Sequence, residues 1–282
     1  MIPNRQKQLA QKFNDMHKQK GIIILPNAWD TGSAVIFEKE GFQAVATTSA
    51  GVAYSLGYPD GEYIKIDDLI LTTKQIAKRI DIPLSIDFES GYSDDIKEIK
   101  ENAKKLIKAG ACGFNIEDGK KDGTLDTTEH MIEKINALKE LKKELDINFV
   151  INARTCTYWL NIGNEKEKLK TATQRGNIFA KAGADCVFVP GAMDKETVTQ
   201  LTQNINSPLN IILNPTYHYI KEMETIGVKR ISVGSGMARL IQNNTIETAK
   251  KLKENNVDDI LSHKLTYAKA NEYFALHDTN DK

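Results

Sequence analysis

Three acidic side chains stand at the ends of two successive apolar segments. Asp87 and Glu89 end the segment PLSIDFE, and Glu117 lies near the end of the next, GFNIED. Alternate residues of a strand point to the same side, so Asp87 and Glu89 are predicted to face one opening together. Carboxylates gathered in this way raise one another's pKa, and a hard divalent cation relieves the repulsion. These residues predict a Mg²⁺ site, or a Mn²⁺ site by the same preference for oxygen ligands. The alternative is that the acids pair with lysines or cap helices.

Other polar residues also follow apolar segments. Arg154 ends NFVINAR, and its planar guanidinium is suited to clamp a carboxylate with two hydrogen bonds. A structural salt bridge to Glu117 is the alternative, and both roles can hold together. The small-residue turn 47–51 offers backbone amides that could cradle an anionic oxygen. Further polar residues at segment ends are Asn27, Asp30, Thr48, Ser49, Asp118, Asn152 and Asn214.

Eight apolar segments recur along the chain and are predicted to be strands. Most are continuous runs rich in Ile, Val and Phe, a pattern typical of strands that are buried on both faces. The segments are Gly21–Trp29, Phe42–Ser49, Pro83–Glu89, Gly113–Asp118, Asn148–Arg154, Cys186–Pro190, Leu209–Pro215 and Arg230–Gly234.

Helical patterns lie between these segments. Ile96–Ala109 places its apolar residues on one stripe, and Thr128–Leu145, Glu165–Ala182 and Asp194–Gln203 behave similarly. Four of the expected helices end in a glycine that leads into a strand, which fits a left-handed helix cap. These glycines are Gly41, Gly110, Gly183 and Gly227.

Strand–helix alternation predicts parallel strands joined by right-handed crossovers, and eight such units predict a (β/α)8 TIM barrel. An open doubly wound sheet is the alternative, although no glycine-rich dinucleotide loop follows the first strand. We expect one domain over residues 1–282, with an N-terminal capping helix at 1–20, the barrel at 21–240 and a C-terminal helical extension at 241–282. In such a barrel the carboxyl ends of the strands carry the site, which is where the polar residues fall.

Composition narrows the range of partners. The 38 basic and 38 acidic residues balance, which argues against nucleic acid and membrane surfaces as partners. The three cysteines, Cys112, Cys156 and Cys186, lack the spacing of a zinc site, and the first and last of them lie in apolar runs typical of buried thiols. The chain shows no signal peptide and no apolar run of the roughly 20 residues needed to span a membrane, so we expect a cytoplasmic protein.

A family resemblance spans about residues 21–240. The motifs PNAWDTGSA, SLGYPDGE, SIDFESGY, GFNIEDG and INART follow one another in the order and spacing of the isocitrate lyase/phosphoenolpyruvate mutase superfamily, which the chain resembles. The resemblance implies an α/β barrel that binds Mg²⁺ and a small 2-oxo or 2-hydroxy acid. It also implies a homo-oligomer, a dimer or a tetramer, in which the last helix is often exchanged between subunits.

The resemblance also implies roles for single residues. Asp87 matches the acid that touches the metal directly, and Glu89 and Glu117 match ligands that act partly through water. Asp60, in YPDGE, matches an acid near the reacting centre, so Asp60, Arg154 and Glu117 are the expected catalytic residues. Substrate is expected on Arg154, on Asn214 and on a backbone cradle formed by Thr48, Ser49 and Ala50. Chemistry in this superfamily passes through an enolate of pyruvate or a relative.

The loop at residues 119–124 departs from the family pattern. Lyases that split isocitrate-like substrates carry a cysteine and a histidine there, and phosphonate mutases carry Asn-Ser after a lysine, whereas this chain reads GKKDGT. The proton donor is therefore sought elsewhere, at Tyr92, Cys156, Tyr217 or His218. Cys156 lies two residues after Arg154, and the arginine could lower the pKa of its thiol. The alternative for Cys156 is an ordinary packed thiol.

The sequence supports one leading function and several alternatives. The leading prediction is a Mg²⁺-dependent lyase that cleaves a C–C bond in a small 2-oxo or 2-hydroxy dicarboxylate through an enolate. The first alternative is a P–C bond phosphonomutase or hydrolase acting on a phosphonate. The second is a metabolite-binding barrel without turnover. A ketopantoate-type hydroxymethyl transferase would need a folate partner, and no feature of the sequence indicates one.

Overall fold

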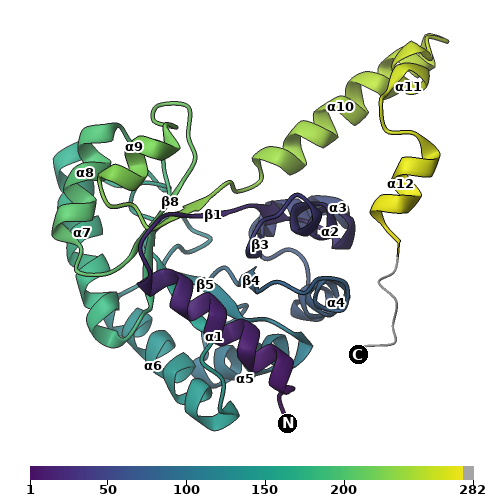
Figure 1. Ribbon diagram of the computed structural model, residues 1–282. Helices are drawn as coiled ribbons and strands as arrows, with labels where there is room; N and C mark the ends of the chain where they lie inside the picture. Colours follow the sequence, from purple (N-terminus) through teal and green to yellow (C-terminus); the bar gives the residue numbers. More distant parts are fainter. Residues whose placement is uncertain (276–282) are drawn as a thin grey trace.

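The computed structural model describes residues 1–275 and shows a nearly closed α/β barrel (Figure 1). Within these residues nine strands pair in parallel, in the order β1-β9-β8-β7-β6-β5-β4-β3-β2. They are β1 Ile23–Leu25, β2 Asn27–Ala28, β3 Val45–Thr47, β4 Leu84–Asp87, β5 Gly113–Glu117, β6 Val150–Arg154, β7 Cys186–Val189, β8 Leu209–Ile212 and β9 Arg230–Ser232. The predicted barrel is confirmed, with one strand more than the eight expected.

The extra strand arises because the first apolar segment is divided at Pro26. β1 pairs with β9, and β2 pairs with β3, so the two halves of one segment join the two ends of the sheet. Proline has no N–H to give to a ladder, which explains why regular pairing stops there. The side chain of Asn27 bridges the seam: its Nδ2 donates to the Thr47 carbonyl (2.8 Å), and its Oδ1 accepts from the amides of Val233 (2.8 Å) and Gly234 (2.9 Å).

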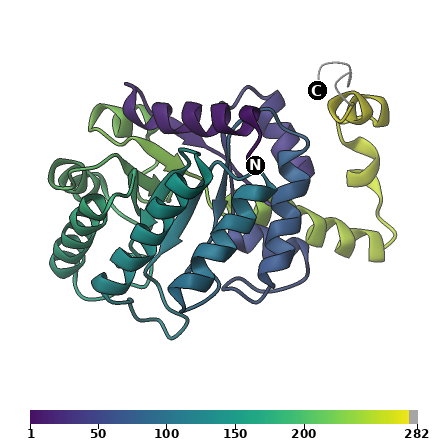
Figure 2. The same ribbon diagram turned by 90° about the horizontal axis from the view of Figure 1, so that it is seen from below.

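Helices alternate with the strands and cover the outside of the barrel (Figure 2). They are α2 Thr31–Lys39, α3 Ser49–Ser55, α4 Ile66–Ala77, α5 Ile96–Ala109, α6 Thr128–Leu145, α7 Glu165–Ala182, α8 Lys195–Asn204 and α9 Ile220–Thr225. α5, α6 and α7 have the bounds that the sequence predicts, and α8 is shifted by one residue. All four junction glycines have positive φ, from 86° at Gly41 to 119° at Gly110, as the left-handed caps require.

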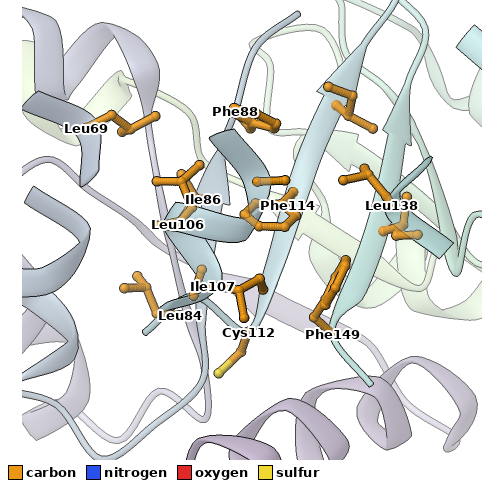
Figure 3. Close-up of a cluster of buried hydrophobic side chains, with 14 of the residues drawn as sticks. Leu69, Leu84, Ile86, Phe88, Leu106, Ile107, Cys112, Phe114, Leu138 and Phe149 are labelled. Carbon is orange, nitrogen blue, oxygen red and sulfur yellow. The ribbon is translucent and has the colours of Figure 1, made fainter. Parts of the chain in front are cut away.

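The largest apolar cluster lies between the strands β4–β6 and the helices outside them. Phe88, Phe114 and Phe149 contact one another in series, with ring centroids 5.5 Å and 5.4 Å apart. Figure 3 shows these rings with Ile86 and with Leu106 and Ile107 of α5, all fully buried. Burial of aromatic and aliphatic side chains of this size contributes roughly 1.5–3 kcal/mol each, so this side of the barrel rigidly supports the strand ends above it.

Two helical segments lie outside the repeat. α1, Asn4–Lys18, packs on the barrel as a cap, with buried Phe13 against Gly113 and Val150. At the other end α10 Gly236–Lys253, α11 Asp258–Ser262 and α12 Tyr267–Tyr273 form an arm that projects from the barrel (Figure 1). The predicted extension is helical, but it begins at residue 236 and is interrupted twice. Its last predicted residues, 276–282, lie outside the described part.

Gly110 provides a test of the junctions between helices and strands. A Cβ added there would lie 2.3 Å from the Ala77 Cβ, whereas one added at Gly41 would meet nothing within 4 Å. We expect Gly110→Ala to lower the free energy of unfolding by about 2–4 kcal/mol, through backbone strain and overpacking. The matched variant Gly41→Ala carries only the strain, roughly 1–2 kcal/mol. Urea unfolding followed by circular dichroism measures both, and equal losses would contradict the packing account.

Candidate active site

A cavity of about 550 Å³ opens at the carboxyl ends of the strands. A second cavity of about 160 Å³ adjoins it, and the two share Ser49, Asp60, Arg154 and Trp159 in their walls. Asp87 lines the larger cavity, whereas Glu89 and Glu117 line the smaller one. The structure thus brings the predicted acids to one end of the barrel, but it distributes them over two adjoining spaces.

Asp87 is the last residue of β4 and is held by neutral donors. Its Oδ2 accepts the Ser49 amide (3.2 Å), and its Oδ1 lies 3.4 Å from the Asn115 Nδ2. Thr47 accepts the Asp87 amide with its hydroxyl (2.9 Å), which fixes the backbone at the strand end. The Asp87 carboxylate is therefore buried and oriented without a paired lysine or arginine among the contacts described.

Glu89 lies beyond the end of β4, which stops two residues earlier than predicted. Its φ of 51° is left-handed, an uncommon and strained conformation for a residue with a side chain. Its two carboxylate oxygens accept the Glu62 amide (3.1 Å) and the Tyr92 hydroxyl (2.9 Å). The simple alternation expected for Asp87 and Glu89 therefore does not apply, because the chain turns between them.

Glu117 pairs with Arg154 across adjacent strands. The two residues are in register in β5 and β6, and Glu117 Oε2 lies 2.9 Å from Arg154 Nη1. This Oε2 is buried, and the contact falls outside hydrogen-bond geometry, so the oxygen has no hydrogen-bond partner among residues 1–275. Both roles foreseen for Arg154 remain compatible, since its guanidinium also stands at the wall of each cavity.

Burial, together with neighbouring charges, raises the pKa of three of the acids. Burial, followed by the Asp87 charge, raises the pKa of Glu89 to about 9. Burial also raises the pKa of Glu117 to about 7, although Arg154 opposes the shift. The pKa of Asp60 is raised by burial and by Asp87. At neutral pH the cluster therefore retains protons that a cation would displace.

The loops around the acids are connected to one another. Glu62 accepts from the Ser90 amide (3.0 Å), the Ser90 hydroxyl (2.7 Å) and the Tyr92 amide (3.1 Å), which ties residues 57–63 to the end of β4. Lys121, in the departing loop, lies 3.6 Å from the Glu62 carboxylate. Asp118 anchors the base of that loop by accepting from Arg175 (2.7 Å) and from the Cys156 amide (2.7 Å).

The anion cradle and Asn214 are located at the larger cavity. Thr48 is the N-cap of α3, and Ser49 and Ala50 begin the helix, so their amides lie among those without a partner inside the helix. One of these amides, that of Ser49, already donates to Asp87. Asn214 lines the cavity, and its Oδ1 accepts the amides of Thr216 (3.0 Å) and Tyr217 (3.1 Å), so that oxygen shapes the loop.

The four candidate proton donors differ in pKa and in their position relative to the two cavities. For Cys156 the structure supports the alternative of a packed thiol: burial raises the pKa of its thiol well above the usual value, and the neighbouring Arg154 does not offset this. Tyr92 lines neither cavity and donates to Glu89, and its pKa is raised by burial and by that carboxylate. Tyr217 and His218 also lie outside both cavity walls.

Sequence reasoning missed a polar network inside the barrel. Arg230 is fully buried, and its Nη2 lies 3.4 Å from the Asn115 Oδ1, which also accepts Asn152 Nδ2 at 2.7 Å. Burial lowers the pKa of Arg230 to about 10. Through Asn115 the network reaches Asp87 from beneath. The sequence did contain a signal for this network, because polar residues occupy inward strand positions. Asn115, Asn152 and Arg230 are among them.

The fold and the site together define an α/β barrel with an acidic site at the carboxyl ends of its strands. The profile of the phosphoenolpyruvate phosphomutase family matches residues 13–253, so the chain belongs to that family. The predicted membership of the isocitrate lyase/phosphoenolpyruvate mutase superfamily is thereby confirmed.

Relatives include lyases, and structural neighbours include lyases and mutases. An uncharacterized protein of Mycobacterium tuberculosis is 37% identical over 223 residues, 79% of this chain and 81% of that protein. The 2-methylisocitrate lyase of Halalkalibacterium halodurans is 27% identical over 215 residues, 73% of this chain and 68% of that protein. A crystal structure from Burkholderia cenocepacia J2315, described as a lyase/mutase, has a TM-score of 0.89 and 28% identity, covering 97% of this chain and 98% of its own. A phosphonopyruvate hydrolase in complex with oxalate and Mg²⁺ has a TM-score of 0.82 and, at 18% identity over 94% of each chain, shows the fold alone.

The raised pKa of Glu89 yields a test of the site's electrostatics. A carboxyl whose pKa is higher in the folded state destabilises the fold as pH rises from about 4.5, its unfolded value, towards 9. In EDTA we expect Glu89→Gln to raise the free energy of unfolding at pH 8 by about 1 kcal/mol or more relative to its effect at pH 5. Urea titrations at both pH values measure this, with the exposed-site variant Glu133→Gln as control. A change independent of pH would contradict a buried, proton-retaining Glu89.

Proposed function

We propose that the chain is a Mg²⁺-dependent lyase that cleaves a C–C bond in a small 2-oxo or 2-hydroxy dicarboxylate through an enolate. The observation that carries the proposal is a cluster of four carboxyls at the carboxyl ends of the strands: Asp87 and Glu89 are buried, Glu117 is half-buried beside Arg154, and Asp60 is exposed on the adjoining loop. The 2-methylisocitrate lyase among the relatives supports the reaction class. The neighbour that holds oxalate and Mg²⁺ supports the choice of cation.

The acidic cluster is suited to Mg²⁺ bound largely through water. Within residues 1–275 no three His, Cys, Asp or Glu side chains converge closely enough to hold a metal between them. Mg²⁺ commonly takes one or two carboxylates and keeps several waters. Asp87 would bind directly, with Glu89 and Glu117, which line the adjoining cavity, holding the coordinated waters. The cation would supply charge stabilisation for the oxyanion that develops during cleavage.

Arg154 and the start of α3 are proposed to hold the substrate. The Arg154 guanidinium lies between the rings of Trp159 (5.4 Å) and Phe188 (5.7 Å), which keep its plane fixed for a carboxylate. The Ala50 amide would bind another oxygen, since the amides of Thr48 and Ser49 already donate to the Ala28 carbonyl (3.0 Å) and to Asp87 (3.2 Å). Asn214, which lines the same cavity, would donate from its Nδ2. Fixed donors of this kind favour the enolate because they need not reorganise as charge develops.

Bond cleavage in a 2-hydroxy acid then follows a retro-aldol course. A carboxylate, assigned here to Asp60, takes the proton of the C2 hydroxyl. The C2–O bond becomes a carbonyl, the C2–C3 bond breaks, and its electron pair passes to C3 as a carboxylate-stabilised enolate. C3 finally takes a proton, which a neutral carboxyl of the cluster can provide because Glu117 has a pKa of about 7.

Phosphonate chemistry is the second candidate. The family profile is that of a phosphomutase, and loop 119–124 carries Lys120 and Lys121 but neither the cysteine nor the histidine of the lyase pattern. The same departure of loop 119–124 from the lyase pattern would also support a metabolite-binding barrel without turnover. The three functions differ in their products, and this difference permits one experiment to separate them.

The decisive test combines turnover with metal binding. With Mg²⁺ present, we expect pyruvate or a related 2-oxo acid to form from 2-hydroxy dicarboxylates, and phosphonopyruvate to remain unchanged by phosphorus NMR. A phosphorus signal that changes would favour the mutase or hydrolase, and oxalate binding without any product would favour the binding barrel.

Asp87→Asn is expected to weaken Mn²⁺ binding, measured by electron paramagnetic resonance, at least tenfold while the thermal unfolding midpoint changes little. Normal Mn²⁺ affinity in this variant would remove Asp87 from the metal site.

We also infer a homo-oligomer built through the C-terminal arm. α10 buries only Ala238 within the described chain, while Leu240, Ile241, Ile246 and Leu252 are about half exposed. Apolar side chains in this number on one helix mark an interaction surface. We expect the double variant Leu240→Lys, Ile246→Lys to lower the molar mass measured by light scattering, whereas exposed Leu71→Lys on α4 should not. An unchanged mass would contradict assembly through α10.

A further inference from the structure

The larger cavity has two walls of different chemistry. One wall is polar and comes from the strand ends β2 to β6, with Asp60, Asp87 and Arg154. The opposite wall comes from β7 to β9 and carries apolar side chains together with the polar side chains of Asn214 and Ser232. The apolar residues of this second wall are Phe188, Pro190, Ile212, Leu213, Pro215 and Val233, and we call them the far wall.

Charged groups are confined to the edge of the far wall. Lys168 is buried and pairs with Glu165 (2.6 Å), and its ammonium lies 5.8 Å from the Tyr158 ring. Arg239, at the start of α10, is exposed to solvent. The centre of this wall therefore offers a ligand hydrophobic contact, and no carboxylate from β7, β8 or β9 faces it.

The space exceeds what a small acid needs. A volume of about 550 Å³ corresponds to roughly 18 waters at about 30 Å³ each. Oxalate or pyruvate fills only a few of those positions beside Arg154. The remainder lies along the far wall, where water would be held against hydrocarbon and would be readily displaced by an apolar group.

The position of Arg154 connects the two walls. Its guanidinium lies over the rings of Trp159 and Phe188, and Phe188 is itself part of the far wall. A carboxylate held by Arg154 therefore lies at the boundary between the polar wall and the far wall, with the acidic cluster on the polar side. A substituent on the carbon chain can extend from that boundary along Phe188 towards Ile212 and Val233, which line the same cavity.

We propose that the far wall is a subsite for an apolar substituent, so that the substrate is a 2-oxo or 2-hydroxy acid bearing a chain of several carbons. This inference rests on the proposed function for the acid head group and adds the class of substituent. The subsite selects substrates by hydrophobic burial, which contributes about 0.8 kcal/mol per methylene when burial is complete.

A homologous series of ligands tests the subsite. Isothermal titration with Mg²⁺ present would compare oxalate, pyruvate, 2-oxobutanoate, 2-oxohexanoate and 2-oxooctanoate. We expect each added methylene to lower the dissociation constant two- to fourfold until the chain reaches the cavity mouth. Affinities that stay level or weaken along the series would overturn the subsite.

Variants of the far wall locate the effect. Val233→Asp and, separately, Ile212→Asp place a carboxylate against the chain, so each should abolish the gain with chain length and leave oxalate affinity within about twofold. Leu71→Asp, on the outer face of α4, is the matched control. Two positions guard against one variant that fails to fold, which circular dichroism would reveal. A gain with chain length that survives in both folded variants would also overturn the assignment.

The same series distinguishes this inference from the proposed function. Oxalate bound with no gain along the series would overturn the subsite alone. A gain with chain length in the absence of any oxalate binding would overturn the Mg²⁺ and head-group proposal, while supporting an apolar-acid site on the far wall.

Discussion

The closure of a parallel sheet into a ring is the constraint on which the site depends. Carboxyl ends of strands meet around one opening only if the first and last strands are joined, and here the join is made by a segment divided at Pro26. Asn27 completes it, because one amide side chain satisfies backbone groups of both β3 and the residues after β9. Without this seam, the residues after β8 and β9 that line the larger cavity would not be held opposite Asp87 and Arg154.

The ring places like charges together, and the protein offsets their repulsion with neutral hydrogen-bond donors and two arginines. Asp87 receives an amide and a side-chain N–H, Glu89 receives an amide and a phenol, and Glu117 receives Arg154. The buried Arg230 adds positive charge from beneath without forming an ion pair within the described residues. The cost of gathering carboxyls appears as their raised pKa values, and that protonation is the state from which a cation would bind with release of protons.

Much of the fold was accessible from the sequence because buried parallel strands and capped helices have strong local patterns. All eight apolar segments form strands, and the ends of α5, α6 and α7 agree to the residue. The division at Pro26 and the left-handed Glu89 were not predicted, because both depend on how neighbouring strands meet.

The grouping of Asp87, Glu117 and Arg154 followed from their positions at strand ends. The raised pKa of Cys156 did not, since charge neighbours are visible in a motif whereas burial is not. Arg230 was overlooked because an arginine at the start of a strand looks like a surface residue until the barrel encloses it.

The three cysteines can report local opening of the barrel in solution through the rates at which their thiols are modified. Cys112, Cys156 and Cys186 are free, buried and raised in pKa, so a thiol reagent meets almost no thiolate while the barrel is closed. They lie in separate regions: before β5, in the loop after β6, and at the start of β7. Their modification rates therefore report how often each of these regions opens, and Cys156, whose amide is tied to Asp118, reports on the floor of the site without an added label.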